Sequence, residues 1–197
     1  YLYRYLKGPY RMTRLSVNLN KVALLRNTRD VGYPSVLETA KLVLEAGAHG
    51  ITIHPRPDER HIRRADVPEI AAFLAGHNAP FPSFMMKDGE VKDIEYNIEG
   101  YPDEEFMALV TNNACDQVTL VPDAPDQKTS DHGWDIGARR DFLKDIIAEL
   151  KAAGRRVSLF VDHDPKMADA AAEVGADRVE LYTGPYAMNA ALLSAYV

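Results

Sequence analysis

Residues 45–53 read Glu-Ala-Gly-Ala-His-Gly-Ile-Thr-Ile, and residues 173–181 read Glu-Val-Gly-Ala-Asp-Arg-Val-Glu-Leu. Each stretch runs from the end of a helical pattern through a glycine into a short, mainly apolar run. A looser third copy, Lys-Ala-Ala-Gly-Arg-Arg-Val, occupies residues 151–157. A helix that stops at glycine and leads into a buried strand is the junction of a βαβ unit. The repeat therefore predicts an α/β fold built from parallel strands in right-handed succession.

Six short runs around these junctions predict strands, at residues 15–20, 50–55, 95–100, 117–122, 156–162 and 178–184. Several are apolar at successive positions, which is typical of parallel strands buried on both faces. Helical patterns fall between them, at residues 36–46, 66–75, 102–110, 137–153 and 164–175. Ser35 and Glu38 have the spacing of a capping box at the first of these helices.

Two architectures fit such an alternation, an open doubly wound sheet and a closed eight-stranded barrel. The open sheet usually carries a glycine-rich turn after its first strand, whereas this strand runs into Asn18-Leu19-Asn20-Lys21. We therefore expect a TIM-type (β/α)8 barrel. Since a complete barrel needs about 250 residues and this chain has 197, we expect it to be incomplete, with about six of the eight βα units.

The barrel domain is expected to span residues 12–197. Residues 1–11 read YLYRYLKGPYR, which is basic and aromatic and has no apolar core of a secretory signal. Met12 follows directly and opens the first strand pattern. We therefore expect residues 1–11 to be an upstream or non-native extension.

The composition narrows the possible partners. The formal net charge is −6 and the sequence pI is about 5.5, so a nucleic-acid partner is not expected. No apolar run approaches the roughly 20 residues that cross a bilayer. The single cysteine, Cys115, cannot form an internal disulfide, and we interpret it as a core residue of a cytoplasmic protein.

Barrel enzymes carry their chemistry at the C-terminal ends of the strands, and polar residues gather there in this sequence. The richest stretch is His54-Pro55-Arg56-Pro57-Asp58-Glu59-Arg60-His61. Arginine binds phosphate oxygens bidentately, and histidine moves protons near neutral pH. A solvated charged loop is the alternative. The arginines would repel a metal dication and no cysteine pair is present, so no metal site is expected.

Other strand ends supply further candidates. Glu99 closes the third strand, as a general base or as a structural acid paired with an arginine. Asn18 and Asn20 alternate and so point the same way. Arg26 and Arg29, in an expected loop, are either phosphate ligands or surface charges, and Thr129 is either a ligand or a turn residue. Glu180, within the sixth strand, suits a lining or salt-bridge role as well as catalysis.

At these residues the sequence resembles the pyridoxine 5′-phosphate synthase family. The matching stretches are residues 16–29, GITIHPRPDERHI at 50–62, Asn-Ile-Glu-Gly at 97–100, VTLVPDAPD at 118–126 with Thr129, and residues 157–162 followed by the helix 167–175. The resemblance implies a condensation of two small phosphorylated ketones, 1-deoxy-D-xylulose 5-phosphate and 3-amino-2-oxopropyl phosphate, without a cofactor. It also implies a homo-oligomer, commonly an octamer.

The resemblance assigns roles by position. His54 and Glu99 match the proton acceptors of the family. Asn18 and Arg29 match contacts to the amino-ketone phosphate. Contacts to the deoxyxylulose phosphate are matched by Asn20, Lys21, Arg56, His61 and Thr129.

The chain departs from the family pattern in three places. Many members carry Asp-His where this chain has Asn20-Lys21. Residues 78–94 are longer than the usual link and predict a hairpin or a flap. The later motifs are missing, an Asn-Ala-Gly-His run with the proton-donor histidine and a Gly-His loop that binds phosphate.

Two other functions remain open, a barrel isomerase or epimerase of sugar phosphates and a non-catalytic phosphate-binding fragment. An incomplete barrel would also leave its first and last strands unpaired. We therefore expect this chain alone to be inactive, and poorly soluble or molten.

Overall fold

The computed structural model describes residues 13–29, 31–76, 94–123, 127 and 130–188. Its six strands form one parallel sheet in the order β1-β2-β3-β4-β5-β6. The strands are β1 (Ser16–Asn18), β2 (Gly50–Ile53), β3 (Glu95–Gly100), β4 (Gln117–Leu120), β5 (Arg156–Val161) and β6 (Arg178–Leu181). All six predicted strands are confirmed, five of them shorter than predicted. The sequential order contradicts the doubly wound alternative, whose strand order reverses at a switch point.

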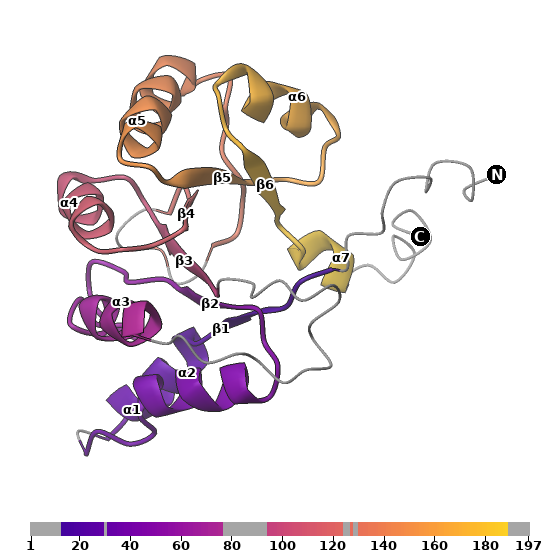
Figure 1. The fold of residues 1–197 in the computed structure, drawn as a ribbon. Helices are drawn as coiled ribbons and strands as arrows, with labels where there is room; N and C mark the ends of the chain where they lie inside the picture. The colour runs from indigo at the N-terminus through magenta and orange to yellow at the C-terminus, as the bar shows by residue number, and fades with distance from the viewer. Residues whose placement is uncertain (1–12, 30, 77–93, 124–126, 128–129, 189–197) are drawn as a thin grey trace.

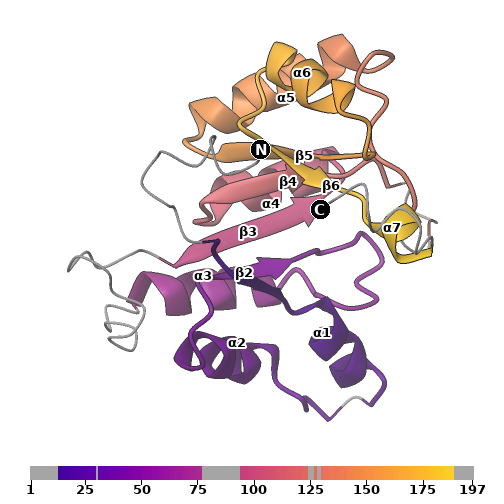
Figure 2. The ribbon, with the colours of Figure 1, turned by 90° about the vertical axis from the view of Figure 1, so that its right-hand side faces the viewer.

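The helices are α1 (Asn20–Asn27), α2 (Val36–Glu45), α3 (Asp66–Gly76), α4 (Glu104–Asn112), α5 (Arg140–Ala152), α6 (Lys166–Glu173) and α7 (Gly184–Met188). Figures 1 and 2 show that α2 to α6 lie on the outer face of a curled sheet. The described residues thus form a curled half-barrel. This agrees with an incomplete barrel, and it orients the carboxyl ends of all six strands to one rim.

The two faces of the sheet differ sharply in polarity. Outward-facing residues such as Ile51, Ile98 and Val118 are fully buried in the core between the sheet and the helices. Inward-facing residues such as Asn97 and Thr119 are buried too, but they are polar. The central strands are therefore buried on both faces, as expected, but their inward-facing residues are mainly polar, and only the helix-facing side packs in the apolar core.

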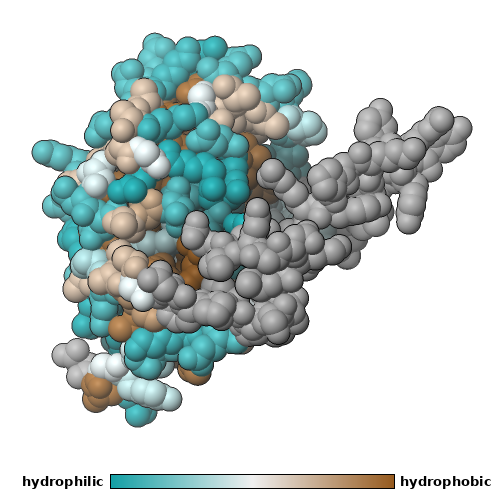
Figure 3. Space-filling view, in the orientation of Figure 1, coloured by the Kyte–Doolittle hydropathy of each residue, from teal (hydrophilic) through white to brown (hydrophobic). Residues whose placement is uncertain are grey.

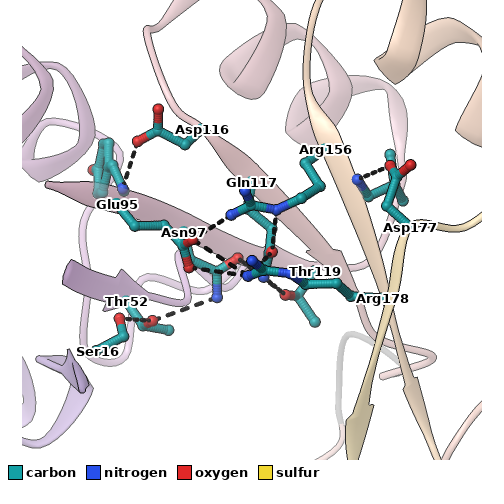
Figure 4. Close-up of polar contacts among 12 residues, drawn as sticks. Ser16, Thr52, Glu95, Asn97, Asp116, Gln117, Thr119, Arg156, Asp177 and Arg178 are labelled. Atoms are coloured by element: carbon teal, nitrogen blue, oxygen red, sulfur yellow. Dashed lines mark hydrogen bonds and ion pairs between the residues drawn. The ribbon is translucent and has the colours of Figure 1, made fainter. Parts of the chain in front are cut away.

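A hydrogen-bonded network runs across this inner face (Figure 4). It includes one residue from each strand in turn: Ser16, Thr52, Asn97, Gln117, Arg156 and Arg178. Both arginines also contact the carboxylate of Glu95. Buried polar groups are costly unless they are bonded, so this network lets a polar inner face exist without an apolar filling.

The internal repeat has a structural role at the other end of the strands. In three pairs of neighbouring strands, β1–β2, β3–β4 and β5–β6, the side chain just before the second strand accepts a hydrogen bond from a backbone N–H at the start of the first. These bonds join His49 to Leu15 (3.0 Å), Asp116 to Tyr96 (2.7 Å) and Asp177 to Val157 (2.9 Å). Two of these acceptors, His49 and Asp177, end the repeat patterns Gly-Ala-His and Gly-Ala-Asp, whereas Asp116 makes the same bond outside the repeat.

Helix α1 was not expected, because residues 20–27 were interpreted as a strand end followed by a loop. Asn18 Oδ1 accepts a hydrogen bond from the N–H of Asn20 (2.9 Å), at the point where the strand gives way to the helix. Leu19, Ala23 and Arg26 then follow at helical spacing and are buried. Helix α7 was also not expected. At α2 the Ser35 cap is confirmed, with its Oγ accepting from the N–H of Glu38 (3.2 Å).

Some predictions lie outside the described residues, namely the extension at residues 1–11 and all but the last residue of the longer link at 78–94. Cys115 lies in the core, as predicted. Across the part of the chain that the structure describes, no helix has both the length and the apolar character needed to cross a membrane. The face drawn in Figure 3 is mainly hydrophilic, with hydrophobic residues in small patches.

Candidate active site

His54 and Glu99 meet where two neighbouring strands end. His54 follows β2 directly, Glu99 lies in β3, and the two strands pair with Ile53 opposite Ile98. His54 Nδ1 lies 3.9 Å from Glu99 Oε2, and both side chains are about nine-tenths buried. The sequence therefore correctly predicted that the histidine after the second strand and the acid closing the third would converge.

Two asparagines from the first strand and helix complete this cluster. Asn18 Nδ2 donates to Glu99 Oε2 (3.5 Å), and Asn20 Oδ1 accepts from the backbone N–H of His54 (2.8 Å). Asn20 therefore holds the backbone of the histidine, while Asn18 contacts the acid. Four of the predicted site residues come together in this way from three adjacent strand ends.

The environment disfavours the charged form of both members of the His54–Glu99 pair. Burial raises the pKa of Glu99 well above its usual range, and the nearby carboxylates of Glu180 and Asp123 raise it further. Burial lowers the pKa of His54 to about 3, assisted by the positive charge of Arg56. The close approach is therefore not an ion pair at neutral pH. It places a neutral imidazole beside a carboxyl group that retains its proton unusually well.

Glu180 reaches the same rim from the far side of the curled sheet. It lies in β6 opposite Phe160 of β5, and it is half-buried. Burial raises the pKa of Glu180 as well. Its charge is one of the causes that raise the pKa of Glu99.

Arg56 is buried and is bound by the loop after β4. One guanidinium nitrogen contacts Asp123, and Nη1 donates to the carbonyl oxygen of Gln127 (2.6 Å). Asp123 also accepts from Ser130 Oγ (2.7 Å). The sequence placed Asp123 at the end of the fourth strand but gave it no role. The sequence signal that could have identified Asp123 was the position of an acid directly after a predicted buried strand.

His61 packs beside His54, with ring centroids 5.9 Å apart in an edge-on arrangement. Burial lowers the pKa of His61 to about 4, and Arg56 and Arg60 lower it further. Its Nδ1 accepts from the N–H of Ile62 (2.9 Å), which leaves Nε2 to carry the proton. A second neutral imidazole thus lies beside His54 at the carboxyl ends of the strands.

Arg26 is hydrogen-bonded to the backbone of the loop that contains His61. It lies in α1 rather than in the expected loop, and its Nη1 contacts Asp66 Oδ1 at 2.5 Å within a buried ion pair. Its Nη2 donates to the carbonyl oxygen of His61 (3.0 Å). These contacts occupy the guanidinium of Arg26, and its role as a phosphate ligand stays a prediction.

The remaining candidates are peripheral or outside the described residues. Lys21 and Arg29 are exposed, and Thr129 lies in a part of the chain that the structure does not describe. Within the described ranges no group of three or more His, Cys, Asp or Glu side chains is placed to hold a metal ion.

A curled sheet of sequential parallel strands, with titratable side chains at the carboxyl ends of the strands, is the arrangement found in the class of β/α-barrel proteins. Comparison with known sequences then gives the family. The chain belongs to the family described as pyridoxal phosphate biosynthesis protein PdxJ, whose model matches residues 15–195.

Curated relatives are similar over most of this chain. Proteins named pyridoxine 5′-phosphate synthase from Mesorhizobium japonicum and Brucella anthropi are each 54% identical over 173 residues, which is 88% of this chain and 65% of the relative. One from Allorhizobium ampelinum is 51% identical over 175 residues. This chain therefore spans 65% of the length of these relatives.

Proposed function

We propose that this chain is the larger part of a pyridoxine 5′-phosphate synthase. The enzyme would condense 1-deoxy-D-xylulose 5-phosphate with 3-amino-2-oxopropyl phosphate to give pyridoxine 5′-phosphate, inorganic phosphate and water. The observation that carries this proposal is the buried His54–Glu99 pair at the strand ends of a PdxJ-family chain. Among the residues that the structure describes, no feature favours the isomerase or the non-catalytic alternative over it.

The electrostatics of the pair suit the chemistry. Imine formation, enolisation and dehydration each need protons to be moved, so the site needs more than one acid or base. A neutral His54 is available to accept a proton throughout the physiological range, since its pKa is lowered to about 3. Glu99, whose pKa is raised, is a stronger base than an ordinary carboxylate once it is ionised and otherwise acts as an acid.

Two phosphorylated substrates need two anion sites. In the proposal, Asn18 and Arg29 contact the amino-ketone phosphate. Asn20, Lys21, Arg56, His61 and Thr129 contact the deoxyxylulose phosphate. Glu180 and Arg26 are secondary candidates. Arg56 and His61 stand beside His54, so a phosphate held there would place its carbon chain next to the acid–base pair.

At the length of its relatives the protein is proposed to close into an eight-stranded barrel. The half-barrel described above has β1 and β6 at its edges, and two further βα units would join them. A homo-octamer and a cytoplasmic location belong to the same proposal. The polar inner face supports closure, because a closed barrel would shield the network of Figure 4 from solvent.

The test is turnover of the protein made at the length of its relatives, beside His54→Asn and His132→Asn variants. His132 is an exposed histidine in the loop before Gly133, which makes it a matched control. Product is measured by chromatography. Loss of the proton acceptor is expected to lower kcat about 10²–10⁴-fold, while the control retains activity. If the unaltered protein forms no pyridoxine 5′-phosphate, or if His54→Asn matches it, the proposal is wrong.

A further inference from the structure

Asp123 is a buried acid near the carboxyl ends of the strands, and it so far has no assigned role. Its side chain is about nineteen-twentieths buried, and it follows β4 by three residues. A buried carboxylate persists only where other groups compensate for its lost hydration. What surrounds Asp123 therefore indicates what it does.

One carboxylate oxygen of Asp123 makes both of its polar contacts. Oδ2 contacts the guanidinium of Arg56 and accepts from Ser130 Oγ at 2.7 Å. Arg56 in turn donates from Nη1 to the carbonyl oxygen of Gln127 (2.6 Å). Both bonds that orient the guanidinium thus come from the loop after β4, although Arg56 itself follows β2.

These contacts bridge the carboxyl end of the strand that carries Glu99. In the sheet, β3 lies between β2 and β4, so the Arg56–Asp123 pair spans the loops on either side of it. An arginine side chain has many rotamers and loses that freedom when it is held. Asp123 therefore fixes one guanidinium orientation before any substrate arrives.

The other oxygen of Asp123 has no partner. Oδ1 is buried and makes no hydrogen bond within the described part of the chain. Asp123 also lines a small cavity of about 20 Å³, together with His54, Arg56 and Tyr101. By this measure a cavity of about 10–15 Å³ is enough for one water molecule, and an orphaned carboxylate oxygen is the acceptor such a water needs.

We propose that Asp123 is a positioning residue of the candidate active site, which holds Arg56 in its phosphate-binding orientation and binds one ordered water at its second oxygen. It acts through Arg56 and does not contact the substrate. The inference rests on the proposed function in that it takes Arg56 to be a phosphate ligand.

The position of Asp123 also gives it an electrostatic effect that a merely structural residue would lack. Its charge is one of the groups that raise the pKa of Glu99. A neutral isostere would therefore weaken phosphate binding through Arg56 and, separately, lower the pKa of Glu99.

The experiment uses the protein made at the length of its relatives as the unaltered chain, and compares it with Asp123→Asn, Asp123→Glu and the control Glu149→Gln, an exposed acid on α5. Calorimetry measures the binding of inorganic phosphate and of 1-deoxy-D-xylulose 5-phosphate. Carbon NMR follows the titration of Glu99, and circular dichroism checks the fold. Asp123→Asn is expected to weaken both bindings on the order of tenfold, the loss that follows from one charge-assisted hydrogen bond. It should also lower the pKa of Glu99, while Asp123→Glu recovers part of both effects.

If Asp123→Asn binds both ligands as the unaltered chain does and Glu99 titrates unchanged, the inference is overturned. If the unaltered chain binds inorganic phosphate through Arg56, and this binding weakens in Asp123→Asn, but the deoxyxylulose phosphate never binds, the proposed function fails and the inference stands. If Asp123→Asn does not fold, a crystal structure of the unaltered chain decides whether the inference holds. A water within hydrogen-bond distance of Asp123 Oδ1 supports the inference, and an empty cavity overturns it.

Discussion

At the scale of single residues, the protonation of His54 and Glu99 is governed mainly by burial. Desolvation is the largest cause of both shifts, and it acts in opposite directions because it always disfavours the charged form. Neighbouring charges then add to each shift, from Arg56 for the histidine and from Glu180 for the acid. The site thus holds an acid and a base side by side without forming an ion pair.

This arrangement predicts that Glu99→Gln stabilises the protein at pH 8 while removing activity. The folded state binds the Glu99 proton more tightly than the unfolded chain does. As the pH rises above the ordinary carboxyl pKa, the unfolded chain releases that proton first, so the free energy of unfolding falls. Glutamine removes this loss and should raise Tm at pH 8, by about 2–4 °C for each kcal/mol recovered.

The measurement is thermal and urea unfolding of both proteins at pH 4 and pH 8, with Glu45→Gln on the exposed end of α2 as the control. At pH 4 the variant and the unaltered protein should be nearly equal, because Glu99 is protonated in both states. At acidic pH the unfolded chain binds the His54 proton more readily than the folded state, because the pKa of folded His54 is lowered to about 3. This lowers the free energy of unfolding of both proteins alike. A Glu99→Gln variant less stable than the unaltered protein at pH 8 would mean that Glu99 is paired rather than desolvated.

At the scale of the elements, the segment before α5 is fastened to the end of β5. Gly133 N donates to Asp162 Oδ1 (3.0 Å), and Trp134 N donates to the carbonyl oxygen of Phe160 (2.9 Å). The indole of Trp134 is buried and donates to the carbonyl oxygen of Leu120 (2.9 Å), so Trp134 packs this segment against the end of β4. This segment joins β4 and β5 just beyond the loop that holds Arg56.

The close approach at Gly133 predicts that Gly133→Ala is destabilising. A Cβ there would lie 2.3–2.4 Å from backbone atoms of Val161 and Asp162, so the backbone itself would have to move. We expect a loss of about 1–3 kcal/mol in the free energy of unfolding, the usual cost of overpacking. Urea denaturation monitored by Trp134 fluorescence measures it.

Gly76→Ala is the matched control, because a Cβ at the end of α3 meets no atom within 4 Å. It should be neutral or stabilising by up to about 1 kcal/mol, since alanine favours the helix. Equal stability of the two variants would show that the Gly133 contact relaxes at no cost.

At the scale of the whole molecule, the described half-barrel has two unpaired sheet edges. β1 and β6 are the outer strands of the sheet, and apolar residues on them or next to them are exposed, with Leu15 at 58% and Leu181 at 47%. Unpaired edges of this kind pair with other chains. The inner face is less prone to associate with other chains, because its polar groups are mostly hydrogen-bonded to one another.

The 197-residue chain is therefore predicted to self-associate, and Val179→Lys on β6 should reduce that association. A lysine on an edge strand opposes strand addition by charge and hydration. Ala168→Lys, an exposed site on α6, adds the same charge away from both edges. Sedimentation velocity compares the three proteins. A sharp cooperative melt of a monomeric unaltered chain would contradict the prediction.

The sequence by itself determined the strands, their parallel succession and the side chains at their carboxyl ends. These follow from local periodicity and from junctions such as Gly47-Ala48-His49, which operate over a few residues. His54, Glu99, Asn18 and Asn20 were located in this way, because strand ends of a parallel sheet must share one rim.

The tertiary structure alone decided which of these groups pair. The Arg56–Asp123 contact joins residues 67 positions apart, and Arg26 meets Asp66 only because the unexpected α1 carries it beneath the His61 loop. The polar inner face likewise depends on the curl of the sheet. Such features arise from strand register and chain closure over long separations, and no short-range pattern in the sequence encodes them.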